Sequence, residues 1–401
     1  MNRILLMFVC LCFSTISMGQ VFEKRTISNP DIQVGAERMG KYLPLLKDKK
    51  IGIICNHTSL VGETHLVDTL LSLGVDVERI FAPEHGFRGD ASAGATINDS
   101  TDPKTGLPIV SLYGSNKKPK AEMVYDLDFL IFDIQDVGAR FYTYISTMHY
   151  AMEAAAENDV TFIVLDRPNP NGFYVDGPIL DPEFKSFVGM HPIPVVHGLT
   201  VGELAVMING EGWLKDGAEA KLRVVTCRNY KHLDLYELPA APSPNLPTME
   251  SIYLYPSLCL FEGTKVSVGR GTETPFEIIG YPGYGFGSFA FKPQSIPGVS
   301  DHPKHEGEQC FGHSLTDVGE FYFTTGRMLN LDWIIGMYET YPDKDNFFTG
   351  KNFIDKLAGT SELRKQIIAQ NSIEEIRRSW EPELSEYKMM RKRYLLYTDF
   401  E

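Results

Sequence analysis

Short segments that are apolar at nearly every position recur through the first half of the chain, and helical patterns separate them. They are expected to form strands at residues 51–55, 79–82, 109–112, 129–132 and 162–165. A strand that is apolar at successive positions is buried on both faces, as in a parallel sheet that helices cover on both sides. Between the last two segments, apolar residues recur at helical spacing and predict a helix from about Phe141 to Glu157. We therefore predict an α/β fold built on a parallel sheet.

Two further helices begin at sequences that match a capping box, in which a Ser or Thr precedes a Glu by three positions. One follows Thr200 and runs to about Ile208, and the other follows Ser372. A strand is expected at 222–226, four prolines between residues 239 and 247 then interrupt regular structure, and the glycine-rich stretch 263–287 is expected to form loops. We place a domain boundary after the prolines, which gives an N-terminal domain at 20–250 and a smaller C-terminal domain at 251–401.

The first residues are typical of a secretory signal peptide. Arg3 supplies a positive charge, residues 4–16 are apolar but too few to cross a bilayer, and small residues precede a cleavage position before Gln20. We expect residues 1–19 to be removed, the protein to be exported to the periplasm, and no integral membrane segment to remain. The alternatives are a membrane anchor and a lipoprotein cut at Cys10 or Cys12, although neither cysteine follows the small residue that such a cut needs.

Composition excludes several classes of function. Apolar residues make up 43% of the 401, as in ordinary soluble proteins, and 38 Lys and Arg against 52 Asp and Glu give a net charge of −14. That negative charge argues against broad binding of nucleic acid. No dinucleotide fingerprint, P-loop or serine-hydrolase elbow is present, so we expect no cofactor. The four cysteines outside the signal form one or two disulfides or remain buried thiols, and their spacing is not that of a zinc site.

Polar residues follow four of the predicted strands, at the edge where parallel sheets bind ligands. The segments are 56–59, 83–89, 133–140 and 166–172, and three of them carry both a carboxylate and an arginine. We expect these segments to form one polar cleft. The candidate site residues from this edge and the loop after it are Glu84, His85, Arg88, Asp133, Gln135, Asp136, Arg140, Tyr142, Asp166, Arg167 and His197.

Several of these side chains also fit a purely structural role. Asp166 could bind backbone N–H groups of its own turn, and Asp136 could cap the following helix. Asp133 and Arg140 could form a structural ion pair. His85 and His197 could be interior histidines. Glu84 is harder to explain in this way, because it lies between a proline and a glycine-bearing turn. Enclosure beside Phe87 would favour its protonated form, whereas the charge of Arg88 would oppose it.

An arginine between two glycines adds a charged group from the second half of the chain. Gly269 and Gly271 flank Arg270, and glycine lets a backbone approach a ligand closely. A guanidinium held there suits the two oxygens of a carboxylate. The alternative is a solvated arginine on a surface loop. Asn245 and Glu262, in the loops that precede it in the sequence, are further candidates.

The strings around these residues resemble those of the bacterial exo-β-N-acetylmuramidases. They are PEHGFRG at 83–89, DIQDVGARFYTY at 133–144, LDRPNP at 165–170, HGLTVGEL at 197–204, SPN at 243–245, EGT at 262–264 and GRGT at 269–272. The resemblance runs from residue 50 to residue 397, and the shared order of several motifs makes it specific. One departure is Ser59, where the family pattern has a glycine.

The resemblance implies a Rossmann-like N-terminal domain, a smaller α/β C-terminal domain and an active-site cleft between them. It also implies release of N-acetylmuramic acid (MurNAc) from the non-reducing end of peptidoglycan fragments such as MurNAc-GlcNAc. Glycoside hydrolysis usually needs two carboxyl groups. We expect Glu84 to be the general acid and Asp133 or Asp136 to be the second carboxylate, with Asp166 in reserve.

Muramic acid carries a lactyl carboxylate, which gives the arginines of the cleft a purpose. The candidates for this contact are Arg270, Arg88 and Arg140, in that order. The other expected substrate contacts are His85, Gln135, Tyr142, Asp166, Arg167, His197, Asn245 and Glu262. Two other functions remain open: an exported binding protein for cell-wall saccharides without catalysis, and a metal hydrolase that uses Glu84, His85, Asp133 and Asp136. No HExxH motif or dense ligand spacing supports the metal hydrolase.

Overall fold

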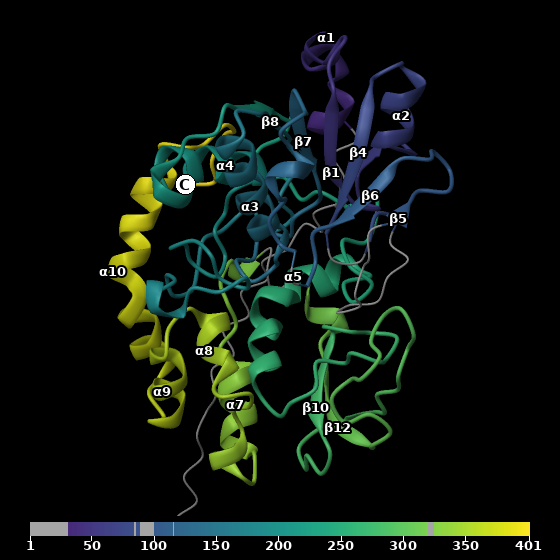
Figure 1. The fold of residues 1–401 in the computed structure, drawn as a ribbon. Helices are drawn as coiled ribbons and strands as arrows, with labels where there is room; N and C mark the ends of the chain where they lie inside the picture. Colours follow the sequence, from purple (N-terminus) through teal and green to yellow (C-terminus); the bar gives the residue numbers. More distant parts are fainter. Residues whose placement is uncertain (1–30, 84–85, 89–99, 115, 320–324) are drawn as a thin grey trace, which may run out of the picture.

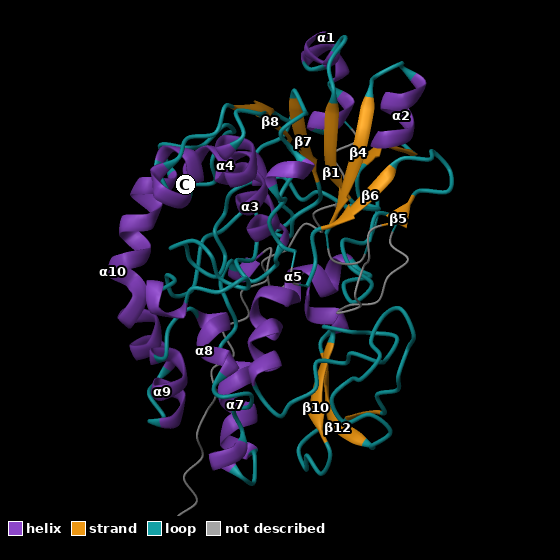
Figure 2. Ribbon diagram, in the orientation of Figure 1, coloured by secondary structure: helices purple, strands orange, loops and turns teal. Residues whose placement is uncertain are grey.

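The protein has an N-terminal part built on a seven-stranded sheet and a C-terminal part that contains a three-stranded sheet (Figure 1). The computed structural model describes residues 31–401 apart from 84–85, 89–99, 115 and 320–324. The expected signal peptide lies outside these residues. Figure 2 shows the strands of the large sheet side by side, with helices packed around them. The predicted α/β class is confirmed.

The large sheet has the strand order of a doubly wound fold. In spatial order its strands are β5 (Ser100–Thr101), β6 (Pro108–Ser111), β4 (Val77–Ala82), β1 (Ile51–Cys55), β7 (Phe129–Asp133), β8 (Thr161–Leu165) and β9 (Leu222–Val225). All neighbouring pairs are parallel except β5 with β6. The chain moves outward from β1 through β4 to β6, and then returns to the other side of β1 with β7. The point between β1 and β7 is therefore the topological switch point, where open α/β sheets bind ligands.

Successive residues of β1 face two different cores, because side chains alternate across a strand. Ile53 packs into a core with α1 (Leu43–Leu46) and α2 (Leu66–Ser72). Ile54 packs into a core with α3 (Tyr144–Glu157) and α4 (Val201–Gly210). Both residues are fully buried. This double burial is the reason that the strands are apolar throughout, and it confirms the argument made from the sequence.

The C-terminal part contains more helix than strand. Its small antiparallel sheet has the order β10 (Ile278–Tyr281), β12 (Cys310–Ser314) and β11 (Phe289–Phe291). Its helices are α5 (Met249–Leu258), α7 (Asp332–Thr340), α8 (Phe353–Ala358), α9 (Glu362–Ile368) and α10 (Ile373–Arg391). Figure 1 shows α10, in yellow, running along one flank of the molecule so that the C-terminus returns to the N-terminal part near α4. Many of the apolar residues of this part belong to the same core as α3 and α4.

Most elements lie within a few residues of their predicted bounds, and both capping boxes form, at Thr200 and Ser372. The expected boundary between residues 250 and 251 falls inside α5. The strands that were not predicted are those of the hairpin of β2 (Leu60–Val61) and β3 (Thr64–His65), strand β5, and all three strands of the small sheet, of which β10 lies within the glycine-rich stretch. These strands are defined by partners rather than by their own apolar pattern. The remaining cysteines are buried free thiols, at Cys55, Cys227, Cys259 and Cys310. None of the described helices has the length and hydropathy needed to span a membrane.

Candidate active site

Hydrogen bonds tie the ends of β1 and β7 together at the switch point. The hydroxyl of Ser59 donates to the backbone carbonyl of Asp133. The backbone N–H of Gln135 donates to Oγ1 of Thr58 at 3.0 Å, and Thr58 is itself held by Oδ1 of Asn56. The loops after the two strands therefore form one rigid unit, which carries both of the aspartates expected to take part in the chemistry.

Asp133 is fully buried and forms an ion pair with Arg167, which follows β8. Nε of Arg167 donates to Oδ1 of Asp133 at 2.6 Å, and Nη2 donates to Oδ2 at 2.9 Å and to the carbonyl of Leu60 at 2.9 Å. The structural ion pair foreseen for Asp133 with Arg140 is therefore wrong in its partner. Because both oxygens of Asp133 are engaged by one guanidinium, the carboxylate is occupied by a structural contact.

Asp136 lies three residues beyond β7 and is engaged on one side only. Its Oδ2 accepts the backbone N–H of Gly138 at 2.7 Å, whereas its buried Oδ1 has no hydrogen-bond partner among the described residues. Nε2 of His197 lies 3.7 Å from Oδ2 of Asp136. Nδ1 of His197 accepts the N–H of Leu199 at 3.2 Å, which assigns the ring proton to Nε2, facing Asp136. Asp136 does not cap a helix, since α3 begins only at Tyr144.

Unpaired polar atoms gather at this edge of the sheet. Besides Oδ1 of Asp136, the buried atoms Nε2 of His197, Oε1 of Gln135 and Nδ2 of Asn56 have no partner in the described part of the chain. The other end of the Gln135 side chain is fixed, because Nε2 donates to the carbonyls of Asp136 and Pro168 at 2.8 Å each. Buried polar groups are seldom left unpaired in native proteins. Their concentration here is what a site that receives a polar ligand requires.

Asp166 plays a structural role within the N-terminal part. Its Oδ1 accepts the backbone N–H groups of Arg167 and Gly202, and its Oδ2 accepts the hydroxyls of Thr200 and Tyr397, at 2.6 to 3.0 Å. Burial raises the pKa of Asp166 to about 6, although these hydrogen bonds act in the opposite direction. The carboxyl thus joins the end of β8 to the start of α4 and to the C-terminal tail, and it has no free oxygen for a substrate.

Two of the three arginines expected to read a carboxylate are committed elsewhere. Arg140 is fully buried and donates to the backbone carbonyls of Pro178, Ile193 and Leu357 at 2.5 to 3.0 Å. Arg88 forms ion pairs with Asp68 and Asp102, which lie 3.2 and 2.9 Å from Nη2. Neither guanidinium has the open end that a bidentate contact with a ligand needs.

Glu84 and His85 lie outside the described residues, so their expected roles stay predictions. Strand β4 ends at Ala82, next to β1, and the ring of Phe87 is buried in an edge-to-face contact with His65 at 4.8 Å between centroids. In the sequence, Glu84 comes two residues after the end of β4, which pairs with β1, one of the two strands at the switch point.

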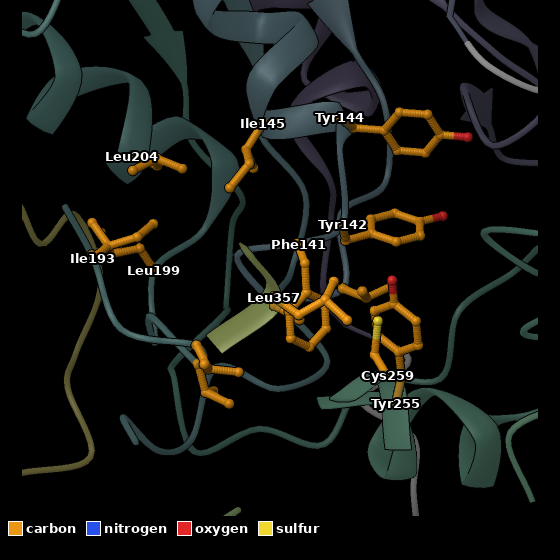
Figure 3. Packing of buried hydrophobic residues seen from close by; sticks show 14 of the residues in the cluster. Phe141, Tyr142, Tyr144, Ile145, Ile193, Leu199, Leu204, Tyr255, Cys259 and Leu357 are labelled. Atoms are coloured by element: carbon orange, nitrogen blue, oxygen red, sulfur yellow. The ribbon is translucent and has the colours of Figure 1, made fainter. Parts of the chain in front are cut away.

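A cavity of about 120 Å³ lies between the N-terminal and C-terminal parts. Its lining consists of Phe141, Tyr142, Thr143, Tyr144, Ser243, Asn245, Leu246, Tyr255, Arg270 and Phe276. Figure 3 shows Tyr142 and Tyr144 extending to the same side, with Tyr255 below them. The ring of Tyr142 makes edge contacts with Tyr144 and Tyr255, at 5.0 and 5.8 Å between centroids, and its hydroxyl donates to the carbonyl of Pro242. The amide of Asn245 is fixed at Nδ2 by the carbonyl of Val299.

Arg270 presents an open guanidinium to this cavity. Its Nε donates to Oε1 of Glu262 at 2.8 Å, and its face lies 5.0 Å from the ring centroid of Phe276. Nη1 and Nη2 make no hydrogen bond to the residues that the structure describes, and the side chain is 31% exposed. The sequence suggested that the flanking glycines let the backbone approach a ligand, but both face neighbouring protein atoms instead. At Gly269 (φ +79°) a Cβ would lie 2.5 Å from Cγ1 of Ile278, so glycine serves the packing of the loop itself.

Tyr144, Tyr255 and Phe276 were not among the residues expected at the site. The aromatic run from Phe141 to Tyr144 could have indicated the first of these. Tyr255 lies on α5 and Phe276 in a loop far along the chain, so no local pattern connects either of them with the site.

Two protein-family models match the sequence of this chain. The N-terminal and C-terminal models described as "Exo-beta-N-acetylmuramidase NamZ" match residues 51–250 and 253–397, respectively. The chain belongs to the NamZ exo-β-N-acetylmuramidase family. The resemblance found in the sequence motifs is thereby confirmed.

A curated relative and two solved structures agree with the NamZ assignment. The peptidoglycan β-N-acetylmuramidase NamZ of Bacillus subtilis (strain 168) is 42% identical over 413 residues, which cover 96% of this chain and 97% of the relative. A crystal structure of a DUF1343 family protein from Bacteroides fragilis NCTC 9343 is 47% identical, with a TM-score of 0.85 over 92% of this chain and 99% of that one. A second such structure from the same organism is 29% identical, with a TM-score of 0.78 over 92% and 100% of the two chains.

Membership of the NamZ family makes the chain a glycosidase, and the alternative of a binding protein without catalysis is set aside. As for the metal hydrolase, no group of three or more His, Cys, Asp or Glu side chains in the described part of the chain is arranged to hold a metal ion. Asp133 and Asp136, two of the four ligands considered for it, are engaged by Arg167 and by the N–H of Gly138.

Proposed function

We propose that this protein is an exo-acting glycosidase that releases MurNAc from the non-reducing end of peptidoglycan fragments such as MurNAc-GlcNAc. The observation that carries the proposal is the open guanidinium of Arg270 at a cavity between the two parts of the chain. MurNAc differs from N-acetylglucosamine (GlcNAc) by a lactyl ether that ends in a carboxylate. A guanidinium held by Glu262 at Nε and free at Nη1 and Nη2 suits the two oxygens of that carboxylate.

The chemistry would be supplied by Glu84 as general acid and Asp136 as the second carboxylate. Asp136 is favoured over Asp133 because its Oδ1 has no partner among the described residues, whereas both oxygens of Asp133 are bound by Arg167. Carboxylates on opposite sides of the bond can protonate the leaving oxygen and attack or activate water at the anomeric carbon. Glu84→Gln, which removes the acidic proton but keeps the shape, should lower kcat by roughly 10²–10⁴-fold. A variant that kept more than about a tenth of the wild-type kcat would contradict this role.

We also propose export as the route of the protein to its substrate. The proposal is supported by the N-terminal sequence, in which Arg3 precedes an apolar stretch and small residues, Ser17 and Gly19, stand three positions and one position before the expected cleavage point. Cell fractionation of the full chain would test it. Mature protein in the periplasmic fraction that begins at Gln20 is expected, and an unprocessed chain in the cytoplasm would contradict it.

The decisive experiment incubates the purified mature protein with MurNAc-GlcNAc and with a longer glycan whose non-reducing end is MurNAc. The disaccharide should yield MurNAc and GlcNAc. The longer glycan should lose one MurNAc and then resist further cleavage, because its new end is GlcNAc. Disaccharide products from the longer glycan would show internal cleavage and overturn the exo assignment. Glu84→Gln, treated identically, is the control for a contaminating hydrolase.

A further inference from the structure

A second cation, Lys304, binds the same residue as Arg270, namely Glu262, and has no role in the site described so far. The ammonium group of Lys304 is partly buried and donates to the backbone carbonyls of Phe261, Glu262 and Val266, at 2.8, 3.2 and 3.4 Å. It forms no ion pair with a carboxylate among the residues that the structure describes. Burial lowers the pKa of Lys304, against the opposing influence of the Glu262 charge. Burying a charged ammonium group costs free energy, and here only neutral carbonyl groups bind it. This arrangement needs an explanation.

The three charges at this place do not cancel. Burial alone would raise the pKa of Glu262, but the charges of Arg270 and Lys304 outweigh it and lower the pKa, so the carboxylate stays ionised. One negative charge therefore faces two positive ones. The local excess is positive although the whole chain carries −14. At short range, and in a partly buried place, nearby charges outweigh distant ones.

The backbone also holds Arg270 at a conformational cost. Phe276, whose ring packs on the guanidinium, has φ +59°, a left-handed conformation that is uncommon for a bulky residue. Strained backbone of this kind is typical of ligand sites and persists only where the surroundings enforce it. Glu262 at Nε and Phe276 on the face fix the guanidinium, so its two terminal nitrogens are oriented before a ligand arrives.

We propose that Glu262, Arg270 and Lys304 form an anion subsite for a saccharide carboxylate, in which Arg270 makes the contact and Lys304 supplies the uncompensated positive charge. The inference rests on the proposed function for the identity of the ligand, the lactyl carboxylate of MurNAc. Lys304 is a specificity-determining residue here, since it acts through its charge and through the carbonyls of the loop that carries Glu262. A purely structural lysine would affect charged and uncharged ligands alike.

The test compares MurNAc with its methyl ester, which keeps the shape of the lactyl group and removes its charge. Both are measured as competitive inhibitors of wild type, Lys304→Gln and Lys265→Gln. The first variant keeps two of the three N–H donors of the ammonium group and loses its charge. The second is a matched control, because Lys265 is a neighbouring lysine that is exposed. Thermal unfolding of each variant reports any loss of folding.

In the wild type, the acid should bind at least tenfold more tightly than the ester. Lys304→Gln should weaken binding of the acid by roughly 5- to 30-fold and change binding of the ester by less than about twofold. Lys265→Gln should leave both inhibition constants within about twofold of wild type. Equal weakening of acid and ester in Lys304→Gln would overturn the subsite. If that variant does not fold, the wild type still decides, because equal binding of acid and ester would overturn it as well.

The two proposals fail separately. If MurNAc-GlcNAc is cleaved while Lys304→Gln treats acid and ester alike, the subsite is wrong and the proposed function stands. If the disaccharide is not cleaved but the acid binds in a manner that depends on Lys304, the reaction is wrong and the anion subsite stands, with binding read by calorimetry instead of inhibition.

Discussion

The hydroxyl of Tyr387 in the last helix donates to the backbone carbonyl of His197 at 2.7 Å. One turn further along α10, Arg391 donates to the carbonyl of Gly198 through Nε and Nη2, at 3.0 and 2.7 Å. His197 in turn lies 3.7 Å from Asp136. The C-terminal helix therefore holds the loop that places a histidine opposite the carboxylate at the switch point, and the N-terminal site is not complete without it.

Removal of the hydrogen bond from Tyr387 to the carbonyl of His197 should affect activity more than folding. Tyr387→Phe loses one buried hydrogen bond, which contributes about 1 kcal/mol, and frees the backbone of His197 to move. We expect kcat/KM on MurNAc-GlcNAc to fall roughly 3- to 10-fold at temperatures well below unfolding. The matched control is Tyr394→Phe, which removes a hydroxyl bonded to Glu211 on the same segment. Equal losses in the two variants would contradict a positioning role for Tyr387.

The two aspartates after β7 should behave differently when changed to asparagine. Asp133→Asn leaves the buried guanidinium of Arg167 without its counter-ion, which should lower the free energy of unfolding by about 3–5 kcal/mol. Asp136→Asn should fold normally and lose kcat by at least about 10²-fold. Urea unfolding and steady-state kinetics on both variants check this. External azide should rescue Asp136→Asn alone, and near-normal turnover in that variant would remove Asp136 from the mechanism.

Arg270 should determine the preference for MurNAc over GlcNAc. A bidentate contact with a carboxylate contributes about 1.5–3 kcal/mol, so Arg270→Ala should lower kcat/KM for an aryl β-MurNAc glycoside roughly 10- to 150-fold. Cleavage of the β-GlcNAc glycoside should change little, because that sugar has no lactyl group. Arg88→Ala, which breaks ion pairs with Asp68 and Asp102, should lower stability without changing the preference. Equal cleavage of both glycosides by the wild type would refute lactyl recognition.

Asp166 should make stability depend on mildly acidic pH. Its pKa is raised from the ordinary 3.8 to about 6 in the folded protein, so the folded state binds the proton more tightly than the unfolded state does. The stabilisation of the folded state by the protonated Asp166 carboxyl is complete below about pH 4. It is lost as pH rises through about 6, which lowers the free energy of unfolding by roughly 3 kcal/mol. Asp166→Asn cannot titrate. The difference in unfolding free energy between wild type and variant should therefore fall over this range, and a constant difference would contradict the raised pKa.

Local pattern was enough to predict the architecture. The apolar runs at 51–55, 129–132 and 162–165 gave strands buried on both faces, because burial on two sides leaves no position for a polar residue. Thr200 followed by Glu203 gave the start of α4, because a capping box is complete within four residues. The position of the polar segments past the strand ends then gave the edge at which the site lies.

Only the tertiary structure decided which polar groups are free. Arg88, Arg140 and Arg270 look alike in the sequence, yet Arg88 is held by two carboxylates, Arg140 by three carbonyls, and Arg270 alone keeps terminal nitrogens without a partner in the described chain. Asp133 and Asp136 are likewise distinguished only by the fold, because Arg167, which follows β8, pairs with Asp133 and not with Asp136. Periodicity and caps depend on neighbours within a few positions. The partner of a charged side chain depends on which distant segments the packed core brings within about 3 Å of it, and no local pattern specifies that.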